Sequence, residues 1–250
     1  MKELPRVLVI AGTDSSGGAG LIRDVQVISD FGARAAGVIT AVTAQTHREL
    51  DATCLLPVEI VRQQLRAALR CAPVSAMKIG MLGSGAIVRE VLEALPDRAQ
   101  IPSIVDPVLS SSSGAALLDD EGVVLLREQL FARSTLITPN LIEAARLLGC
   151  EVAGDATAQF NQAAALLRFG SQGVLLKGGH GSDSDAVDVL ATQSGSPVSL
   201  HARRISASMR GTGCALSSAI AALLVAGASL ESACRQAKAY VHKELQAAAL

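Results

Sequence analysis

The 250-residue sequence has few aromatic side chains and no excess of either charge. It contains no tryptophan, one tyrosine and four phenylalanines, so it offers little from which to build base-stacking platforms or aromatic cages. Its 22 lysines and arginines balance 23 aspartates and glutamates, which leaves a formal net charge of -1. A balanced charge gives no electrostatic reason to expect nucleic acid or an anionic membrane surface as a partner, and we expect neither.

Paired cysteines and long apolar runs are also missing. The five cysteines stand singly, with no CxxC pair and no matching histidine cluster, which argues against a zinc site and against a disulfide framework. An odd number of thiols without an N-terminal signal peptide is typical of a reducing cytosol, so the expected location is cytoplasmic. No run approaches the roughly 18 apolar residues of a membrane span, and we expect a soluble protein.

Apolar runs of strand length alternate with segments of helical period, which is typical of an α/β fold with a parallel sheet and helices on both faces. We predict strands at Val7–Ala11, Ala36–Val42, Ala76–Gly80, Ser103–Asp106, Thr135–Thr138 and Gly173–Lys177, and an antiparallel edge pair at Ala186–Leu190 and Val198–Ala202. We predict helices at Leu21–Phe31, Pro57–Arg70, Ala86–Leu95, Glu121–Leu130, Leu141–Leu148, Thr157–Phe169, Gly213–Ala226 and Leu230–Leu245, the last capped by Ser229. No linker or repeat divides the chain, so we expect one domain over residues 1–250.

A glycine-rich turn follows the first predicted strand. Residues Gly12–Gly20 contain four glycines and open onto a helix, so the backbone there can approach a ligand closely and present unpaired amides. The spacing fits neither GxGxxG nor a P-loop, and a turn without any ligand is the alternative. Asp24 lies one turn into the helix. Its side chain faces the opening of the same ligand site if the glycine-rich turn folds back, or it is a solvated acid that suits the helix dipole.

A second glycine loop, Arg210–Ser218, runs directly into a helix of small residues. The amides of residues 212–215 would point along the helix axis at a developing negative charge, as in an anion hole. Cys214 lies in the first turn, where the helix dipole favours a thiolate that could serve as an acid, base or nucleophile. Packing beside an Ala-rich helix is the alternative role for this cysteine.

Polar residues follow three of the middle strands. Asp106 ends one of them, while Asn140 and Glu143 are three residues apart at a helix start and can both face one hard cation or its waters. A helix-capping arrangement of Asn140 and Glu143 is the alternative. Lys177, followed by two glycines, suits a phosphate contact and would otherwise be solvated. An anion hole, a magnesium pair, a phosphate-seeking lysine and a glycine loop together are the parts that phosphoryl transfer needs.

Eight segments, in order and spacing, resemble the hydroxymethylpyrimidine and phosphomethylpyrimidine kinases of thiamine biosynthesis, which have the ribokinase-like fold. These segments are Ala11–Gly20 (AGTDSSGGAG), Asp24, Ile39–Thr46 (ITAVTAQT), Lys78–Leu82 (KIGML), Asp106–Val108 (DPV), Thr138–Ala144 (TPNLIEA), Lys177–His180 (KGGH) and Gly211–Leu216 (GTGCAL). The resemblance implies ATP as co-substrate, Mg2+ as cofactor and a homodimer. It also implies that the acceptor is 4-amino-5-hydroxymethyl-2-methylpyrimidine and then its monophosphate.

The resemblance also implies roles for single residues. Gly12, Asp24, Gln45 and Met81 correspond to the pyrimidine site, where the Gln45 amide can pair with a ring nitrogen and an amino group and Met81 supplies an apolar face. Cys214 corresponds to the catalytic residue, and the amides from Gly211 through Thr212 and Gly213 to Cys214 correspond to the anion hole. Asn140 and Glu143 correspond to the magnesium-water motif, and Asp106, Lys177 and Thr212 to the nucleotide site.

Several positions depart from the family pattern. Arg210 replaces a common histidine, and an arginine there can grip phosphate or cover the loop. Leu109–Ser113 (LSSSS) and Thr46-His47 also differ, and the chain ends at Leu250 without a glycine-rich closing stretch. These departures concern the second phosphorylation and the nucleotide lid more than the first phosphorylation.

Two other functions remain open at the level of sequence. A pyridoxal or pyridoxine kinase of the same fold also phosphorylates a hydroxymethyl group on a heteroaromatic ring, although Gln45 and Met81 favour the pyrimidine. A pyrimidine-binding sensor without turnover would need no metal and phosphate residues, so Asn140, Glu143, Lys177 and Cys214 argue against it. The fold alone does not decide between these functions.

Overall fold

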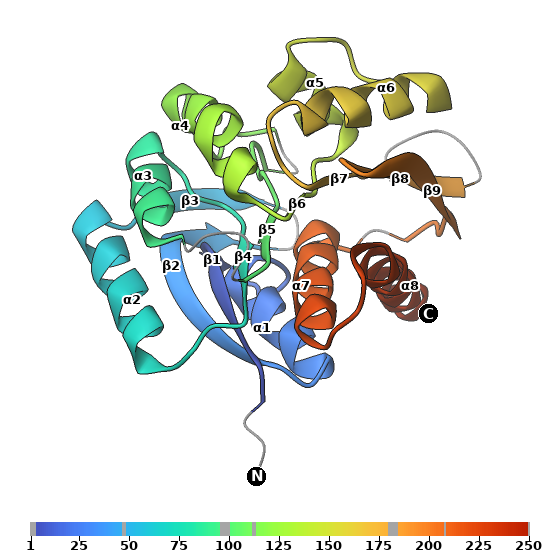
Figure 1. Cartoon of the computed structure of the whole chain (residues 1–250). Coiled ribbons are helices and arrows are strands. Elements are labelled where there is room, and N and C mark those ends of the chain that lie inside the picture. The colour runs from blue at the N-terminus through green and yellow to red at the C-terminus, as the bar shows by residue number, and fades with distance from the viewer. Residues whose placement is uncertain are drawn as a thin grey trace.

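The computed structural model describes residues 4–46, 49–95, 101–111, 114–179, 185–207 and 209–249. Nine strands form one sheet in the order β3-β2-β1-β4-β5-β6-β7-β8-β9 (Figure 1). The strands are β1 (Arg6–Asp14), β2 (Arg34–Gln45), β3 (Leu50–Leu55), β4 (Ala76–Ile79), β5 (Ser103–Val105), β6 (Leu136–Ile137), β7 (Gly173–Leu176), β8 (Asp185–Thr192) and β9 (Gly195–Arg203). The helices are α1 (Gly20–Asp30), α2 (Val58–Cys71), α3 (Gly85–Ala94), α4 (Asp120–Leu125), α5 (Leu141–Leu148), α6 (Ala156–Leu167), α7 (Thr212–Val225) and α8 (Leu230–Ala248).

The centre of the sheet is parallel and both of its edges are antiparallel. Strands β2, β1, β4, β5, β6 and β7 run in one direction. Strand β3 pairs antiparallel with β2, and β8 and β9 form an antiparallel pair beyond β7. The predicted α/β fold is therefore confirmed, including the antiparallel edge pair at residues 186–202. The sequence pattern misses β3, because every residue after Leu50 in this strand is exposed and no buried face marks it.

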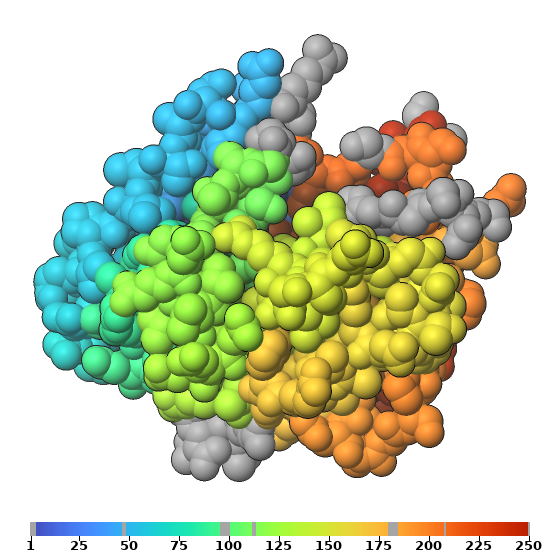
Figure 2. Space-filling model, turned by 90° about the horizontal axis from the view of Figure 1, so that it is seen from above, coloured from blue at the N-terminus to red at the C-terminus, as the bar shows by residue number. Residues whose placement is uncertain are grey.

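Helices cover both faces of the sheet, which explains why the central strands are apolar throughout. In β1, Leu8 and Ile10 pack into the core under helices α2 to α6, while Val7 and Val9 pack into the core under α1, α7 and α8. From above, the green to yellow segments that hold α4 to α6 lie between the blue N-terminal part and the orange C-terminal part (Figure 2). Helix α4 continues through a π-helical turn at Leu126–Leu130 and a 3-10 turn at Phe131–Arg133.

The carboxyl ends of the parallel strands collect polar residues at one edge of the sheet. Asp14 ends β1, Asp106 follows β5, Thr138 follows β6 and Lys177 follows β7. Ligands of open α/β sheets bind outside this edge. Within the described segments, no helix is both long enough and apolar enough to cross a lipid bilayer.

Candidate active site

Two glycine loops contact each other at the carboxyl edge of the sheet. Gly211, the N-cap of α7, has a φ of 69°, and a Cβ on it would lie 2.2 Å from the carbonyl oxygen of Gly18. Gly20, the first residue of α1, has a φ of 61°, and a Cβ there would lie 2.3 Å from the carbonyl oxygen of Gly12. Because glycine alone allows these contacts, the N-termini of α1 and α7 lie side by side and present their free amides together.

Cys214 lies half-buried in the first turn of α7. Burial raises the pKa of its thiol to about 11; the Lys78 ammonium and the Gly20 amide oppose this rise, whereas Asp24 and Asp106 add to it. We expected the dipole of α7 to favour the thiolate. Burial has the larger effect, so the thiol is the favoured form at neutral pH.

A partly buried ion pair lies beside this turn of α7. The Lys177 ammonium is 2.8 Å from Oδ1 of Asp106, and the Thr138 hydroxyl donates to the same oxygen at 3.1 Å. A Cβ on Gly213 would lie 3.1 Å from Lys177 Nζ and 3.2 Å from Asp106 Oδ2. The alternative of a solvated lysine is therefore wrong. Burial lowers the pKa of Lys177, but the charges of Asp106 and Glu143 more than offset that effect and raise the pKa above its ordinary value.

Asn140 and Glu143 form a capping box at the start of α5. Asn140 Oδ1 accepts from the Glu143 amide at 2.8 Å, and Glu143 Oε2 accepts from the Asn140 amide at 2.8 Å. The capping alternative is thus confirmed as geometry, and Oδ1 of Asn140 keeps one lone pair beside the hydrogen bond that it accepts. Burial raises the pKa of Glu143; Lys177 opposes this rise and Asp106 adds to it. Among the described residues, no cluster of three or more histidine, cysteine, aspartate or glutamate side chains is arranged to hold a metal.

Gly12, Met81 and Gln45 lie around the first glycine loop. A Cβ on Gly12 would lie 3.0 Å from the Met81 sulfur, so these two residues are in contact. Gln45 is held through its backbone, because the Ser15 hydroxyl donates to its carbonyl oxygen at 2.8 Å and accepts from its amide at 2.9 Å. The Gln45 side chain accepts from the Thr43 hydroxyl at 3.3 Å and keeps its amide nitrogen for other partners.

Asp24 does not face the mouth of the site as we expected, nor is it solvated. Its side chain is fully buried, with Oδ2 at 2.7 Å from Nζ of Lys78 and Oδ1 accepting from the Ser218 hydroxyl at 2.8 Å. Sequence reasoning missed Lys78 and Ser218 as members of the site. The available signal was a lysine inside a strand whose other residues are apolar, because such a lysine needs an acidic partner when buried.

Arg210 joins three loops around the anion hole. Its guanidinium donates to the Thr46 carbonyl oxygen at 2.9 Å and lies 3.8 Å from Oδ2 of Asp14. It therefore covers the loop, which was one of its two predicted roles. The motif residues His47 and His180, and Ser112 and Ser113 of the segment after Asp106, lie outside the described residues.

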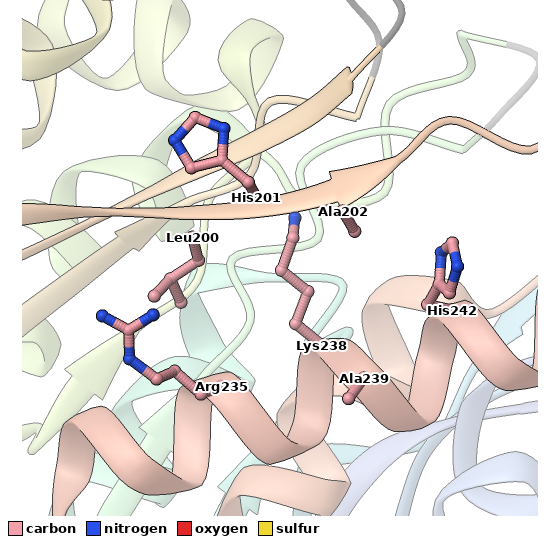
Figure 3. A pocket seen from close by; sticks show the side chains of 7 residues that line it. All are labelled: Leu200, His201, Ala202, Arg235, Lys238, Ala239 and His242. Carbon is pink, nitrogen blue, oxygen red and sulfur yellow. The ribbon is translucent and has the colours of Figure 1, made fainter.

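A cavity of about 300 Å³ lies elsewhere, between β9 and α8 (Figure 3). Its lining includes His201, Arg235, Lys238 and His242 but none of the candidate residues. Two of its cations are already paired, since Lys238 contacts Asp188 at 2.7 Å and Arg235 contacts Glu231 at 2.7 Å. The cavity is thus separate from the cluster at the carboxyl edge.

Known proteins resemble the chain over nearly its whole length. A family model described as phosphomethylpyrimidine kinase matches residues 14–250. The hydroxymethylpyrimidine/phosphomethylpyrimidine kinase of Rhizobium meliloti (strain 1021) is 42% identical over 245 residues, which cover 96% of this chain and 90% of that protein. The solved phosphomethylpyrimidine kinase of Clostridium difficile 630 has a TM-score of 0.82 and 33% identity, and the match covers 96% of this chain and 99% of that one. The pyridoxal kinase of Staphylococcus aureus in complex with ADP has a TM-score of 0.88 and 26% identity, with 97% and 88% covered.

Proposed function

The chain belongs to the phosphomethylpyrimidine kinase family, and on that premise we propose how the residues at the carboxyl edge of its sheet carry out the reaction. It is a hydroxymethylpyrimidine/phosphomethylpyrimidine kinase of thiamine biosynthesis. The observation that carries the residue assignment is the convergence of two helix N-termini on Cys214, with the Lys177–Asp106 pair beside them. Fixed amides and a fixed ammonium are the groups that stabilise a transferring phosphoryl group.

The acceptor pyrimidine binds at Gly12, Gln45 and Met81. The absence of a Cβ at Gly12 lets the Met81 sulfur pack against the Gly12 backbone, and this sulfur offers the ring a polarisable apolar surface. The Gln45 side chain supplies one donor and one acceptor, which match a ring nitrogen and the exocyclic amino group.

Cys214 receives the proton of the acceptor hydroxyl. As the hydroxyl oxygen bonds to the γ-phosphorus of ATP, the bond from that phosphorus to the leaving oxygen of ADP breaks, and the hydroxyl proton passes to the Cys214 thiolate. The free amides at the start of α7, from Gly211 to Cys214, donate to the oxygens of the transferring group. The reaction yields the pyrimidine monophosphate. In the second reaction an oxygen of that phosphate, largely unprotonated at neutral pH, bonds to the γ-phosphorus of another ATP as the bond to the ADP oxygen breaks, and the diphosphate forms without a proton transfer to Cys214.

ATP phosphates lie against Lys177, Asp106 and Thr212. Solved structures of the related pyridoxal kinase of Staphylococcus aureus hold ADP or AMP-PCP, which supports nucleotide binding by this fold. Magnesium fits Glu143, because a carboxylate oxygen that already accepts one hydrogen bond keeps a lone pair for a water of the metal, and Mg2+ keeps several waters when it binds. When bound, the ion would neutralise part of the negative charge of the ATP phosphates. Asn140 then serves by fixing Glu143.

The expected domain count and oligomeric state are those that the family resemblance implies. We expect one kinase domain over residues 1–250 that forms a homodimer. Light scattering on the purified protein measures the mass, for which one chain contributes 25.6 kDa. A single-chain mass at working concentration would contradict the dimer.

Incubation with Mg-ATP and a panel of acceptors tests the substrate. The panel contains hydroxymethylpyrimidine, its monophosphate, pyridoxine, pyridoxal and ribose, and mass spectrometry counts the phosphoryl groups on each product. We expect conversion of the pyrimidine to the monophosphate and then to the diphosphate. Preferred conversion of vitamin B6 forms would reassign Gln45 and Met81 to another ring. Tight pyrimidine binding without turnover would identify a sensor, and the Cys214→Ala variant of an active enzyme should keep pyrimidine affinity while it loses turnover.

A further inference from the structure

A second ion pair lies deeper in the molecule than the site, and the reaction as proposed does not use it. Lys78 and Asp24 have side chains that are 0% exposed, and their charged atoms are 2.7 Å apart. The Ser218 hydroxyl donates to the remaining oxygen of Asp24 at 2.8 Å. Three elements meet in this contact, since Asp24 belongs to α1, Lys78 to β4 and Ser218 to α7.

The pair lies directly behind the first turn of α7. Met77 and Ile79 of β4 pack toward the core under α2 to α6, so Lys78 points to the opposite face, which α1 and α7 cover. A Cβ on Gly80 would lie 2.9 Å from Lys78 Nζ, which shows that the side chain extends along the strand toward the carboxyl edge. Ser218 follows Cys214 by four residues, so the two lie on one face of α7 one turn apart.

Stability alone gives little reason to keep such a pair. Replacing a buried ion pair by apolar residues of similar volume is often neutral or stabilising, whereas removing one partner leaves a costly unpaired charge. The lysine stays charged, because Asp24, Cys214 and Asp106 together raise its pKa above the ordinary value although burial lowers it. The molecule therefore holds the Lys78 side chain behind its anion hole with its ammonium form favoured.

We propose that Lys78 is a positioning residue for Cys214: Asp24 and Ser218 hold its ammonium behind the first turn of α7, where it stabilises the Cys214 thiolate. This assignment deepens the proposed function and rests on it for the catalytic role of Cys214. Four charged groups face the thiol, namely Lys78 from β4, Asp24 from α1, Asp106 after β5 and Lys177 after β7. Burial raises the pKa of the Cys214 thiol. The Lys78 charge lowers this pKa by more than the Asp24 charge raises it.

Alkylation of Cys214 by iodoacetamide tests the assignment without any substrate. The rate is measured against pH on the folded protein, with Cys214 resolved from the other cysteines by peptide mass spectrometry. We expect Lys78→Met to slow alkylation below the thiol pKa by about tenfold, which corresponds to one pKa unit. We expect Asp24→Asn to be alkylated faster than Lys78→Met, because it removes a negative charge near the thiol together with the carboxylate that raises the pKa of Lys78. Both variants break the same contact, so a purely structural role would change both rates alike or leave both unchanged.

Two further variants keep the test decisive if one single variant fails to fold. The double variant Asp24→Asn with Lys78→Met leaves no unpaired charge, and its alkylation rate should lie below that of the wild type but above that of Lys78→Met. Lys238→Met breaks a similar ion pair with Asp188 on α8 and β8, and it should leave the rate at Cys214 unchanged. Equal rates in the double variant and the wild type would overturn the assignment. Since alkylation needs no turnover, failure here is distinguishable from failure of the kinase function, which the acceptor panel reports.

Discussion

Gly211 lies against the backbone of Gly18, and this contact joins the loop before α7 to the loop after β1. A Cβ on Gly211 would lie 2.2 Å from the Gly18 carbonyl oxygen and 3.0 Å from Ala19 Cα. These neighbours are backbone atoms, so no side chain can rotate away to make room. The anion hole at the start of α7 therefore packs directly against the Gly12–Gly20 loop, and movement of either loop displaces the other.

Gly211→Ala should consequently damage both the fold and the reaction. The positive φ costs about 1–2 kcal/mol for alanine, and the clash with Gly18 adds to that cost by separating the loops. We expect a lower denaturant midpoint and a loss of turnover that exceeds the loss of stability. Unfolding curves and initial rates on the same preparation measure the two effects.

Gly149→Ala is the matched control for this variant. Gly149 ends α5 with a φ of 67°, close to the 69° of Gly211, but nothing lies within 4 Å of its missing Cβ. The variant should lose about 1–2 kcal/mol from strain and keep its turnover. Equal turnover in the two variants would show that contact between the loops does not matter for the reaction.

The sequence predicted most of the sheet because its central strands are buried on both faces. Such strands are continuous apolar runs, and β1, β4, β5 and β7 were found within a few residues of their observed bounds. Strand β3 escaped because an exposed edge strand such as Leu50–Leu55 carries no buried face. The glycine loops were visible as motifs, but that Gly211 touches Gly18 depends on packing between segments distant in sequence.

Electrostatics of the site were harder to predict than its position. The helix N-terminus at Cys214 was visible in the sequence, and its dipole suggested a thiolate. The extent of burial, which raises the pKa to about 11, depends on how segments distant in sequence pack around Cys214. The ion pair of Asp24 was equally invisible, because its partners Lys78 and Ser218 lie 54 and 194 residues away in the chain. The sequence therefore suggested a substrate contact for Asp24.

The rate of phosphoryl transfer should rise with pH if Cys214 acts as the base. A base must be unprotonated, and a thiol with a pKa of about 11 is mostly protonated at pH 7. The fraction of thiolate, and with it the rate of the chemical step, should increase about tenfold per pH unit below that pKa. Single-turnover measurements between pH 7 and pH 9 isolate this step.

Two cysteine variants make the pH profile specific to Cys214. Cys214→Asp should flatten the profile, because a carboxylate with a lower pKa is ionised throughout the range, and Cys214→Ala should lose about 10²–10⁴ in rate. Cys234→Ala is the control, since burial raises the pKa of that thiol as well but it lies in α8. A profile that persists in Cys214→Asp would assign the titration to another group.

The capping box of α5 should link helix stability to the magnesium requirement. Asn140→Ala removes the acceptor for the Glu143 amide and should cost about 1 kcal/mol, and it loosens the first turn of α5, which carries Glu143, although the backbone amide at position 140 still donates to the Glu143 carboxylate. We expect the Mg2+ concentration for half-maximal rate to rise. Asp155→Ala removes the equivalent cap of α6, where Asp155 accepts from the Ala158 amide at 2.7 Å. It should cost a similar free energy without changing the Mg2+ requirement, and a shift in both variants would argue against a metal role for Glu143.

Lys177→Met should weaken ATP binding beyond its effect on stability. The variant leaves the carboxylate of Asp106, which is 3% exposed, without its cation, and such a loss typically costs 3–5 kcal/mol. Lys238→Met leaves Asp188 unpaired at 6% exposure, and each aspartate keeps a second donor, Thr138 for Asp106 and Gly178 for Asp188. The two variants should therefore lose comparable stability by chemical denaturation. Only Lys177→Met removes an ammonium that lies beside the first turn of α7. It alone should therefore raise the KM for ATP, while the KM for the pyrimidine stays within a few-fold of the wild type. An equal rise for both variants would mean that loosening of the fold, rather than loss of a phosphate contact, explains the effect.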